Sequence, residues 1–370
     1  MPKSQKSQRK QESPAEARNA SARELLKVLG RGVYDDLEAD KFPSFTLASR
    51  SVNNIVYDKK LQQFILGPAK VKRSAGNIKH IRPFTQLTWL AYFAKQLVSE
   101  KRTSTLRDVY YSAQAFNVEF VDQAESDELI TDLEVLMQMA REGFNVYPEE
   151  RSAIFGNMTI EYTVPGYEGK RADLSANPDG VMIGPALTTA QFKKTDAEMV
   201  LAIEKGGLFT RFVEERVHKK HKAILINTAG QPPRSTRFLI RRLNQELGLP
   251  VGILCDADPW GAHIAMVIKS GSAKAAHLRE LTTPKAVWLG VYASDIVKYK
   301  LPSDKLTEVD IKRLYELKQD PRYTEKMWHE ELDTFLKIRK KSEQEAFARY
   351  GLSYIVDEYL PEKLKLLKAA

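Results

Sequence analysis

Four continuous apolar runs in the second half of the chain constrain its fold more than any other feature. They are Met199–Glu204, Ala223–Thr228, Val251–Asp256 and Ala286–Val291, and stretches with helical periodicity separate them. A strand that is apolar on both faces must be covered on both faces, and such strands alternating with helices are typical of a parallel sheet. The pattern predicts an α/β domain over residues 199–370, with amphipathic helices from Ser303 onward as a C-terminal extension.

Three acidic residues follow two of these expected strands. Glu204 ends the first strand, and Asp256 and Asp258 follow the third, before Pro259 and Gly261 turn the chain into a helix. Ligands of open α/β sheets bind outside the carboxyl ends of the strands, and residues two apart in an extended segment point to the same side. An all-oxygen site of this kind suits Mg²⁺. The competing interpretation is a helix cap, which accounts well for Asp258 but not for the other two acids.

The first half of the chain has a different texture. A helical pattern covers Ala22–Lys41, and short alternating runs at Ser44–Leu47, Asn54–Tyr57 and Gln63–Leu66 predict a small antiparallel meander. Three expected helices (Thr85–Glu100, Ser104–Phe116 and Ser126–Glu142) precede a β-hairpin within Asn145–Val164. This order is that of a winged-helix domain, a helix-turn-helix variant that docks on duplex DNA.

These patterns divide the chain into five parts. We expect a disordered basic tail over residues 1–21, a helix with a meander over 22–83, and the winged-helix domain over 84–165. A polar stretch over 166–198 is expected to link it to the α/β domain over 199–370. The fold class is therefore a multidomain α/β chain.

The formal net charge of +9 and the pI near 9.2 favour a polyanionic partner such as nucleic acid. Lys72 and Arg73 lie in a basic segment around a glycine, which is either a phosphate-contacting loop or a solvated one. Arg237 belongs to an arginine-rich helix near the strand ends, for which DNA contact and simple exposure are both open. The other arginines of that helix are Arg234, Arg241 and Arg242.

A tyrosine pair lies in the second helix of the expected winged-helix domain. In the segment STLRDVYYSAQAF, helical spacing places Val109, Tyr110 and Ala113 on one inward face, whereas Arg107 and Tyr111 share another face. A phenol is mostly protonated at neutral pH, so a nucleophilic role requires a nearby cation, metal or base. Without further information, a tyrosine on an amphipathic helix is usually structural.

The motifs IEKGG, CDADPWG and RDVYYS, taken together, resemble those of the A subunits of topoisomerase VI, the type IIB topoisomerases. The transesterases that initiate meiotic recombination share this core, and the strand-end acids resemble those of Toprim domains. The resemblance covers nearly the whole chain after the tail. It implies that Tyr111 is the nucleophile, that Arg107 positions the scissile phosphate, and that Glu204, Asp256 and Asp258 hold Mg²⁺. Asp108 belongs to the same motif, and a structural hydrogen bond is one role open to it.

The resemblance also implies the assembly. Each tyrosine would work with the Toprim site of the other protomer in a homodimer, cut both strands of duplex DNA and remain linked to the 5′ phosphates. The chain has no GxxxxGK[ST] loop, so ATP would be used by a separate B subunit with a GHKL-type ATPase fold, in a heterotetramer with two copies of each chain.

Three alternatives remain open at this point: a recombination-initiating tyrosine endonuclease, a Toprim nuclease that uses metal-activated water, and a catalytically silent DNA-binding protein. Cys255 is the only cysteine, which excludes an intramolecular disulfide and agrees with a reducing cytoplasm, where we expect the protein at the nucleoid. No apolar run has the roughly 20 residues needed to span a bilayer, so no membrane partner is expected.

Overall fold

The computed structural model describes residues 14–369. Most of the expected basic tail, residues 1–13, lies outside the described residues. The rest of that tail is helical, because the first helix, α1, spans Pro14–Glu38 and begins eight residues before the helical pattern read from the sequence. A proline within the first helical turn is compatible with helix initiation, since its missing N–H would have no partner there.

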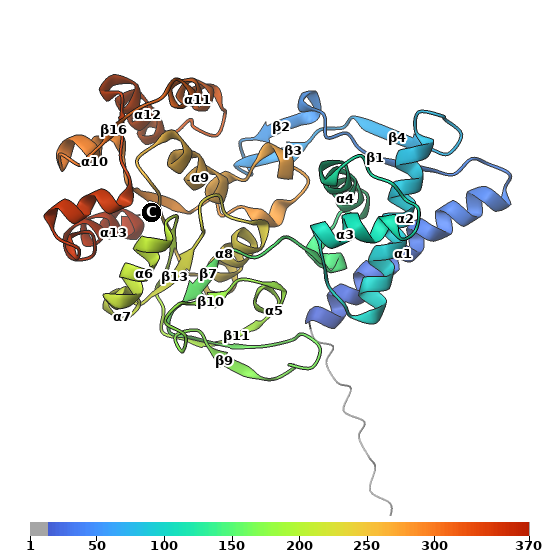
Figure 1. Cartoon of the computed structure of the whole chain (residues 1–370), viewed down its shortest axis with the longest axis horizontal. Coiled ribbons are helices and arrows are strands. Elements are labelled where there is room, and N and C mark those ends of the chain that lie inside the picture. The colour runs from blue at the N-terminus through green and yellow to red at the C-terminus, as the bar shows by residue number, and fades with distance from the viewer. Residues whose placement is uncertain (1–13, 370) are drawn as a thin grey trace, which may run out of the picture.

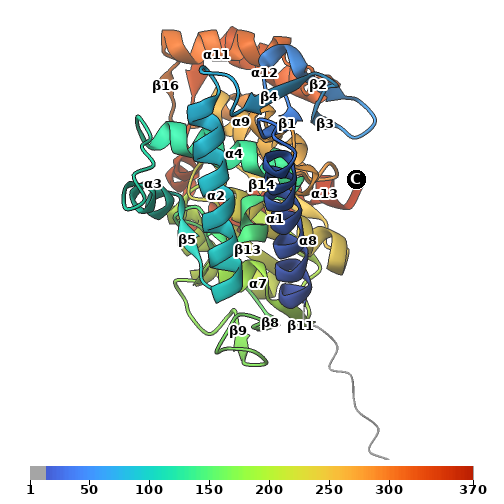
Figure 2. The ribbon, with the colours of Figure 1, turned by 90° about the vertical axis from the view of Figure 1, so that its right-hand side faces the viewer.

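The N-terminal half is a helical unit. α1 lies beside α2 (Ile81–Glu100), as Figure 2 shows, and α3 (Leu106–Gln114) and α4 (Gln123–Met137) complete the bundle. Leu26 of α1, Leu87 and Leu90 of α2, Val109 of α3 and Leu133 of α4 are buried together in its core. The three helices predicted between Phe84 and Glu142 are thus confirmed, with shifted ends.

The expected meander is wrong in its pairing. β1 (Ser44–Ala48) pairs with β4 (Lys70–Ser74), and β2 (Ile55–Asp58) pairs with β3 (Gln63–Leu66), so one antiparallel pair extends from the end of the other. The buried Asn54 side chain holds the junction, because it donates hydrogen bonds to the carbonyls of Ser49 (2.7 Å) and Ala69 (3.2 Å) and accepts one from the Ala69 amide (3.0 Å). A single polar residue thereby satisfies backbone groups that a meander would pair differently.

The C-terminal half contains the predicted parallel sheet. β12 (Met199–Ile203), β13 (Ala223–Asn227), β14 (Val251–Leu254) and β15 (Val287–Gly290) are parallel neighbours in the order β13-β12-β14-β15. All four are almost wholly buried, which explains their continuous apolar sequence.

The helices that follow these strands cover the sheet, and the C-terminal helices gather at one end of the molecule (Figure 1). Their bounds are α6 Gly206–Glu214, α7 Val217–Lys220, α8 Arg234–Leu247, α9 Pro259–Ser270, α10 Ala293–Lys298, α11 Glu308–Gln319, α12 Lys326–Ile338 and α13 Leu360–Ala369. A short strand pair, β16 (Asp304–Lys305) with β17 (Lys340–Lys341), and a π-helical turn at Ile355–Tyr359 complete this region. The predicted C-terminal helical extension is confirmed.

The hairpin expected within Asn145–Val164 does not form. β6 (Val146–Tyr147) pairs in parallel with β5 (Ser104–Thr105) in the helical unit, whereas β7 (Ala153–Phe155) joins the large sheet antiparallel to β13. β8 (Met158–Glu161) turns away into a separate three-stranded sheet. Ile154 and Phe155 are buried against the parallel strands, and this gain in apolar burial favours the long-range pairing over a local hairpin.

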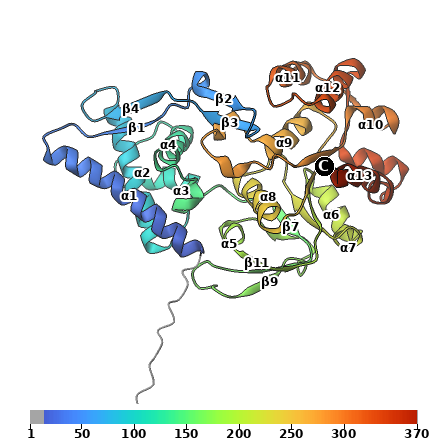
Figure 3. The ribbon, with the colours of Figure 1, turned by 180° about the vertical axis from the view of Figure 1, so that it is seen from behind.

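The expected linker over 166–198 is also wrong, because it is folded into the second half of the chain. β9 (Arg171–Asp173) and β11 (Gln191–Thr195) flank β8, while β10 (Val181–Met182) extends the large sheet beyond β7. This layer lies beside the short helix α5 (Pro185–Thr188), as Figure 3 shows from behind. Leu174, Ile183 and Leu187 are buried in the main core, so scattered apolar residues in a polar sequence were enough to anchor it.

A buried ion cluster joins the two halves. Glu134 of α4 is fully buried and pairs with Arg141 (3.0 Å), with Arg234 of α8 (2.5 Å) and with His277 (3.1 Å). Burial opposes ionisation of Glu134, but Arg141, His277 and Arg234 outweigh it and lower the pKa of this carboxyl. The position of the helical unit against the sheet therefore depends on charged groups. None of the helices in the described part of the chain is long and apolar enough to cross a membrane.

Candidate active site

Two of the three predicted acids, Glu204 and Asp256, lie side by side at one edge of the parallel sheet, and Asp258 follows at the start of α9. β12 and β14 are direct neighbours, with Ile203 opposite Leu254, so Glu204 and Asp256 leave the sheet side by side. The Asp256 amide donates to Glu204 Oε2 (2.9 Å), and the Glu204 amide donates to the Leu254 carbonyl (3.0 Å). The structure thus brings the two strand ends together as the sequence predicted.

Burial gives these carboxyls unusual proton affinity. Burial, followed by repulsion from Asp256, raises the pKa of Glu204 to about 7. Burial also raises the pKa of Asp256 to about 6, although the Gln344 amide and Lys205 oppose the increase. Burial is also the main reason why the pKa of Asp258 is raised. Carboxyls that repel one another in a poorly solvated edge are stabilised by a cation.

Each carboxylate is engaged by a protein donor in the arrangement that the structure shows. Asp256 Oδ1 accepts a hydrogen bond from the backbone N–H of Gln344 (3.0 Å), and its Oδ2 lies 3.2 Å from Lys205 Nζ. Asp258 caps α9 by accepting from the Gly261 amide (2.6 Å). Within residues 14–369, no three such side chains stand in a ready metal-binding arrangement. The oxygen donors fit Mg²⁺ in kind, and side-chain rotation would be needed to direct them at one ion.

Gly261 is required by the close approach of the loop to the helix start. A Cβ at this position would lie 2.2 Å from the Asp256 carbonyl oxygen. Any larger residue would push apart the loop that carries both aspartates and the first turn of α9. Steric crowding therefore explains why a glycine follows the two aspartates in the sequence.

Tyr111 lies exposed on α3, as the helical spacing predicted. Half of its surface (52%) is exposed, whereas Val109 and Ala113 are fully buried and Tyr110 packs against the helical core. The Arg107 guanidinium lies 5.8 Å from the centre of the Tyr111 ring. The nearby Tyr111 phenol is the main reason why the pKa of Arg107 is raised. The two residues therefore form one polar face of α3.

Asp108 has a structural role at the start of α3. It accepts a hydrogen bond from the Thr105 amide (3.1 Å), and Thr105 Oγ1 accepts one from the Asp108 amide (3.0 Å). This reciprocal pair is a capping box, which fixes the first turn of the helix. The structural hydrogen bond considered for Asp108 in the sequence is confirmed.

The tyrosine and the carboxylates belong to different halves of one protomer. α3 lies in the helical unit, while α6 and α9, which begin directly after the acids, lie on the other side of Figure 1.

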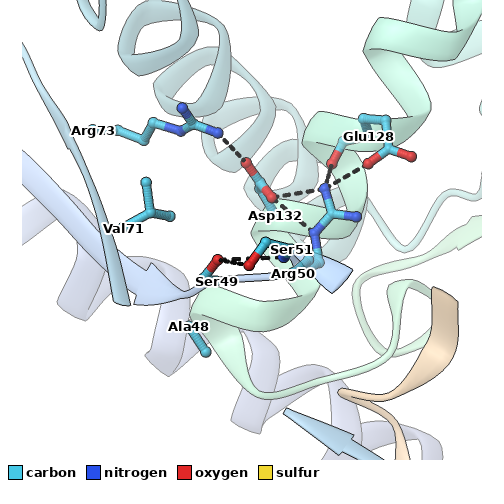
Figure 4. A pocket seen from close by; sticks show the side chains of 8 residues that line it. All are labelled: Ala48, Ser49, Arg50, Ser51, Val71, Arg73, Glu128 and Asp132. Atoms are coloured by element: carbon cyan, nitrogen blue, oxygen red, sulfur yellow. Dashed lines mark hydrogen bonds and ion pairs between the residues drawn. The ribbon is translucent and has the colours of Figure 1, made fainter. Parts of the chain in front are cut away.

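Of the two residues predicted to contact DNA in the basic segment, one is exposed and the other is partly buried. Lys72 is exposed but lies on β4, not in a loop. Arg73, on the same strand, is partly buried and pairs with Asp132 (3.3 Å). Figure 4 shows that Arg50 also pairs with Asp132 (2.8 Å) and with Glu128 (2.7 Å), so both arginines of this surface pocket are held by carboxylates of α4.

The prediction that Arg237 contacts DNA at the surface is wrong. Only 7% of its surface is exposed, and burial followed by repulsion from Arg234 lowers its pKa to about 10. Its neighbours on α8 also turn inward: Arg241 donates to the Thr282 carbonyl (2.6 Å), and Arg242 donates to the Thr188 carbonyl (2.9 Å). Arg241 and Arg242 therefore bind backbone carbonyls of adjoining segments, a role that the sequence does not distinguish from an exposed basic face.

Two residues that contact the acidic site were not predicted from the sequence. Lys205 and Gln344 both contact Asp256, and Gln344 lies 88 positions away along the chain. An antiparallel bridge between Ala257 and Ser342 brings this C-terminal segment to the acidic loop. The lysine directly after Glu204 was a readable signal, whereas the position of Gln344 depends on the tertiary fold.

Comparison with known proteins places these residues in a family. Residues 199–364 match the family model for the Toprim domain of the topoisomerase 6 A subunit/Spo11, and residues 82–146 match the one described as "Type IIB DNA topoisomerase". The chain is 44% identical over 345 residues to the A subunit of type 2 DNA topoisomerase 6 from Methanothermobacter thermautotrophicus, covering 93% of this chain and 97% of the relative. The chain belongs to the family of topoisomerase VI A subunits.

Other members of the family are similarly close. The corresponding protein of Archaeoglobus fulgidus is 40% identical, with 93% of this chain and 97% of the relative covered. That of Methanosarcina barkeri is 39% identical, with 94% and 96% covered. The family resemblance and the Toprim domain expected from the sequence are therefore confirmed, and the tyrosine-bearing segment lies inside the type IIB match.

Proposed function

We propose that this protein cleaves and reseals duplex DNA by transesterification, with Tyr111 as the nucleophile. The observation that carries the proposal is the exposed tyrosine beside Arg107 on α3, within the segment that matches the type IIB family. The winged-helix interpretation remains part of the proposal in reduced form: α2, α3 and α4 would supply a helix-turn-helix surface for duplex DNA, and Lys72 would contact a phosphate.

In the proposed reaction a bond forms between the Tyr111 phenolic oxygen and a backbone phosphorus, and the bond from phosphorus to the 3′ oxygen breaks. The phenol gives up its proton, and the 3′ oxygen takes one up. Arg107 lies close enough to the phenol to hold the phosphate beside it and to balance charge on the non-bridging oxygens. The ester keeps the bond energy, so the reverse step reseals the strand.

Glu204, Asp256 and Asp258 would hold Mg²⁺ in this proposal. When bound, Mg²⁺ would supply positive charge that offsets the charge developing on phosphate or leaving oxygen. The raised pKa values of Glu204 and Asp256 support a role for these residues in cation binding, since a cation removes their mutual repulsion.

The assembly is part of the same proposal, and it agrees with the placement of Tyr111 on α3 and of the acids at the edge of the parallel sheet. We propose a homodimer in which Tyr111 of one protomer acts with the carboxylates of the other, since two tyrosines are needed to cut two strands. A separate GHKL-type B subunit would use ATP, giving a heterotetramer with two copies of each chain. With DNA as its substrate, the enzyme would work at the nucleoid in the cytoplasm.

A plasmid-cleavage experiment tests the nucleophile. The chain, its ATPase partner, Mg²⁺ and supercoiled plasmid are incubated, stopped with detergent and examined for protein covalently bound to cut DNA. Tyr111→Phe should abolish the adduct. Tyr110→Phe is the matched control, because Tyr110 carries the same group on the neighbouring position but packs against the core, so its adduct should persist.

The other outcomes separate the competing reactions. Adducts that persist in Tyr111→Phe would show that another residue is the nucleophile. Cleavage without any adduct would instead indicate hydrolysis by metal-activated water. Adducts that form but never give relaxed, resealed plasmid would favour an endonuclease that initiates recombination.

A further inference from the structure

Lys205 occupies the place where a cation at the carboxylate edge would be expected. It follows Glu204 directly and stands at the start of α6. Its Nζ lies 3.2 Å from Asp256 Oδ2 and 3.5 Å from Glu343 Oε1. Among the described ion pairs of the three acids, this contact to Asp256 is the one that the structure contains.

A lysine ammonium and a divalent metal on the carboxylate of Asp256 would repel each other. Mg²⁺ binds carboxylate oxygen at roughly 2.0–2.1 Å, in a near-octahedral shell that needs room for water. An ammonium 3.2 Å from the same oxygen neutralises part of the charge that attracts the metal, and it repels the metal directly. Metal binding therefore favours movement of the ammonium away from Asp256.

Lys205 has both the freedom and a second partner for such a move. Its side chain is 32% exposed and carries four rotatable carbons, and Glu343 is 68% exposed beside it. Asp256, by contrast, is buried and fixed through the Gln344 amide. The mobile partner is therefore the lysine and not the carboxylate.

We propose that Lys205 is an exchangeable counter-ion of the metal site. In the metal-free protein its ammonium neutralises Asp256, and on metal binding it moves to Glu343 at the solvent side. This inference rests on the proposed metal role of the three acids. It assigns Lys205 as a positioning residue that competes with the metal and keeps the acidic edge from expanding when no metal is present.

The test measures metal affinity directly and contains no DNA. Mn²⁺ is titrated into the complex of full-length chain and ATPase partner, and free Mn²⁺ is followed by electron paramagnetic resonance. Lys205→Met keeps the apolar stem and removes the charge. We expect Mn²⁺ to bind about tenfold more tightly to this variant, and the thermal midpoint of its metal-free form to fall.

Glu343→Gln supplies an independent measurement on an exposed residue, where a folding defect is not expected. It removes the second partner of Lys205, so it should weaken Mn²⁺ binding about threefold when Lys205 is present. In the Lys205→Met background it should have no effect, since no ammonium remains to be moved.

The opposite results are informative. Unchanged or weaker Mn²⁺ binding in Lys205→Met would overturn the proposed counter-ion exchange. The lysine would then either have no effect on metal affinity or hold Asp256 in place for the metal. Equal weakening by Glu343→Gln in both backgrounds would also overturn it, by making Glu343 a ligand. In each case Mn²⁺ binding that is lost in Asp256→Asn would leave the proposed metal site standing. Absence of such binding in the wild type would instead refute both proposals.

Discussion

Replacing Glu134 with glutamine tests whether the buried ion cluster holds the two halves of the chain together. Glu134 accepts hydrogen bonds from the Arg141 amide (2.8 Å) and from Arg141 Nε (3.1 Å), and it pairs with Arg234 across the junction. Glutamine preserves the size of the side chain but removes its charge. The two arginines then remain in a buried setting without their counter-ion.

Breaking a buried pair from one side costs about 3–5 kcal/mol, because the remaining charge has lost its compensation. The expected loss for Glu134→Gln lies near the lower end, about 3 kcal/mol, since the amide oxygen still accepts from Arg141. Glu128→Gln is the matched control. Glu128 lies on the same helix and pairs with Arg50 (2.7 Å), but its side chain is 58% exposed, and such pairs contribute less than about 1 kcal/mol.

Urea unfolding followed by tryptophan fluorescence measures the difference. Trp89 reports on the helical unit, and Trp288 and Trp328 report on the core of the C-terminal half. With a slope of about 3 kcal/mol/M, the midpoint of Glu134→Gln should fall by about 1 M in urea. A fall no larger than that of Glu128→Gln would refute the argument that the cluster joins the halves.

The pH dependence of the same variant has a defined sign. The pKa of Glu134 is lowered in the folded chain, so its contribution is complete above the unfolded value near 4.5 and is lost as the pH falls through the folded value. Acid should therefore narrow the stability difference between the wild type and Glu134→Gln.

Two further changes give equally specific expectations. Burial, followed by repulsion from Arg313, lowers the pKa of His263 from 6.5 to about 4, so its contribution to stability is complete above pH 6.5 and is lost toward pH 4. Unfolding profiles of His263→Gln should lack this loss, which amounts to at most about 3 kcal/mol, and parallel profiles would contradict the assignment. Gly261→Ala should lower Mn²⁺ affinity at least about tenfold in a titration, because the added Cβ collides with the Asp256 carbonyl oxygen. Gly207→Ala, where a Cβ meets only the Glu345 side chain at 3.4 Å, should bind Mn²⁺ as the wild type does.

The sequence predicted the parts of the fold that local pattern determines. β12 to β15 were readable because several short continuous apolar runs alternate with helical patterns, and the acids could be placed because strand ends meet at one edge. Tyr111 was separated from Tyr110 by helical spacing alone. The strands and the choice of Tyr111 depend on neighbours within a few residues, whereas the pairing of Glu204 with Asp256 depends on the rule that parallel strand ends meet at one edge.

The errors arose where long-range pairing decides the outcome. β7 has three residues and β10 has two, too short to be recognised, and their places depend on long-range pairing of β7 with β13 and of β10 with β7. Arg237 has the same local sequence signal whether α8 faces solvent or neighbouring segments. The contact between Asp256 and the Gln344 amide depends on how the C-terminal segment returns across the sheet.

The position of β7 determines where this chain can be divided. The Toprim family match begins at residue 199, but the sheet to which it belongs begins with Ala153–Phe155, paired to Leu225, Ile226 and Asn227 of β13. A fragment started at Met199 would leave the backbone donors and acceptors of β13 open along a strongly apolar strand, a template for self-association. Expression of the C-terminal half on its own should therefore begin ahead of β7.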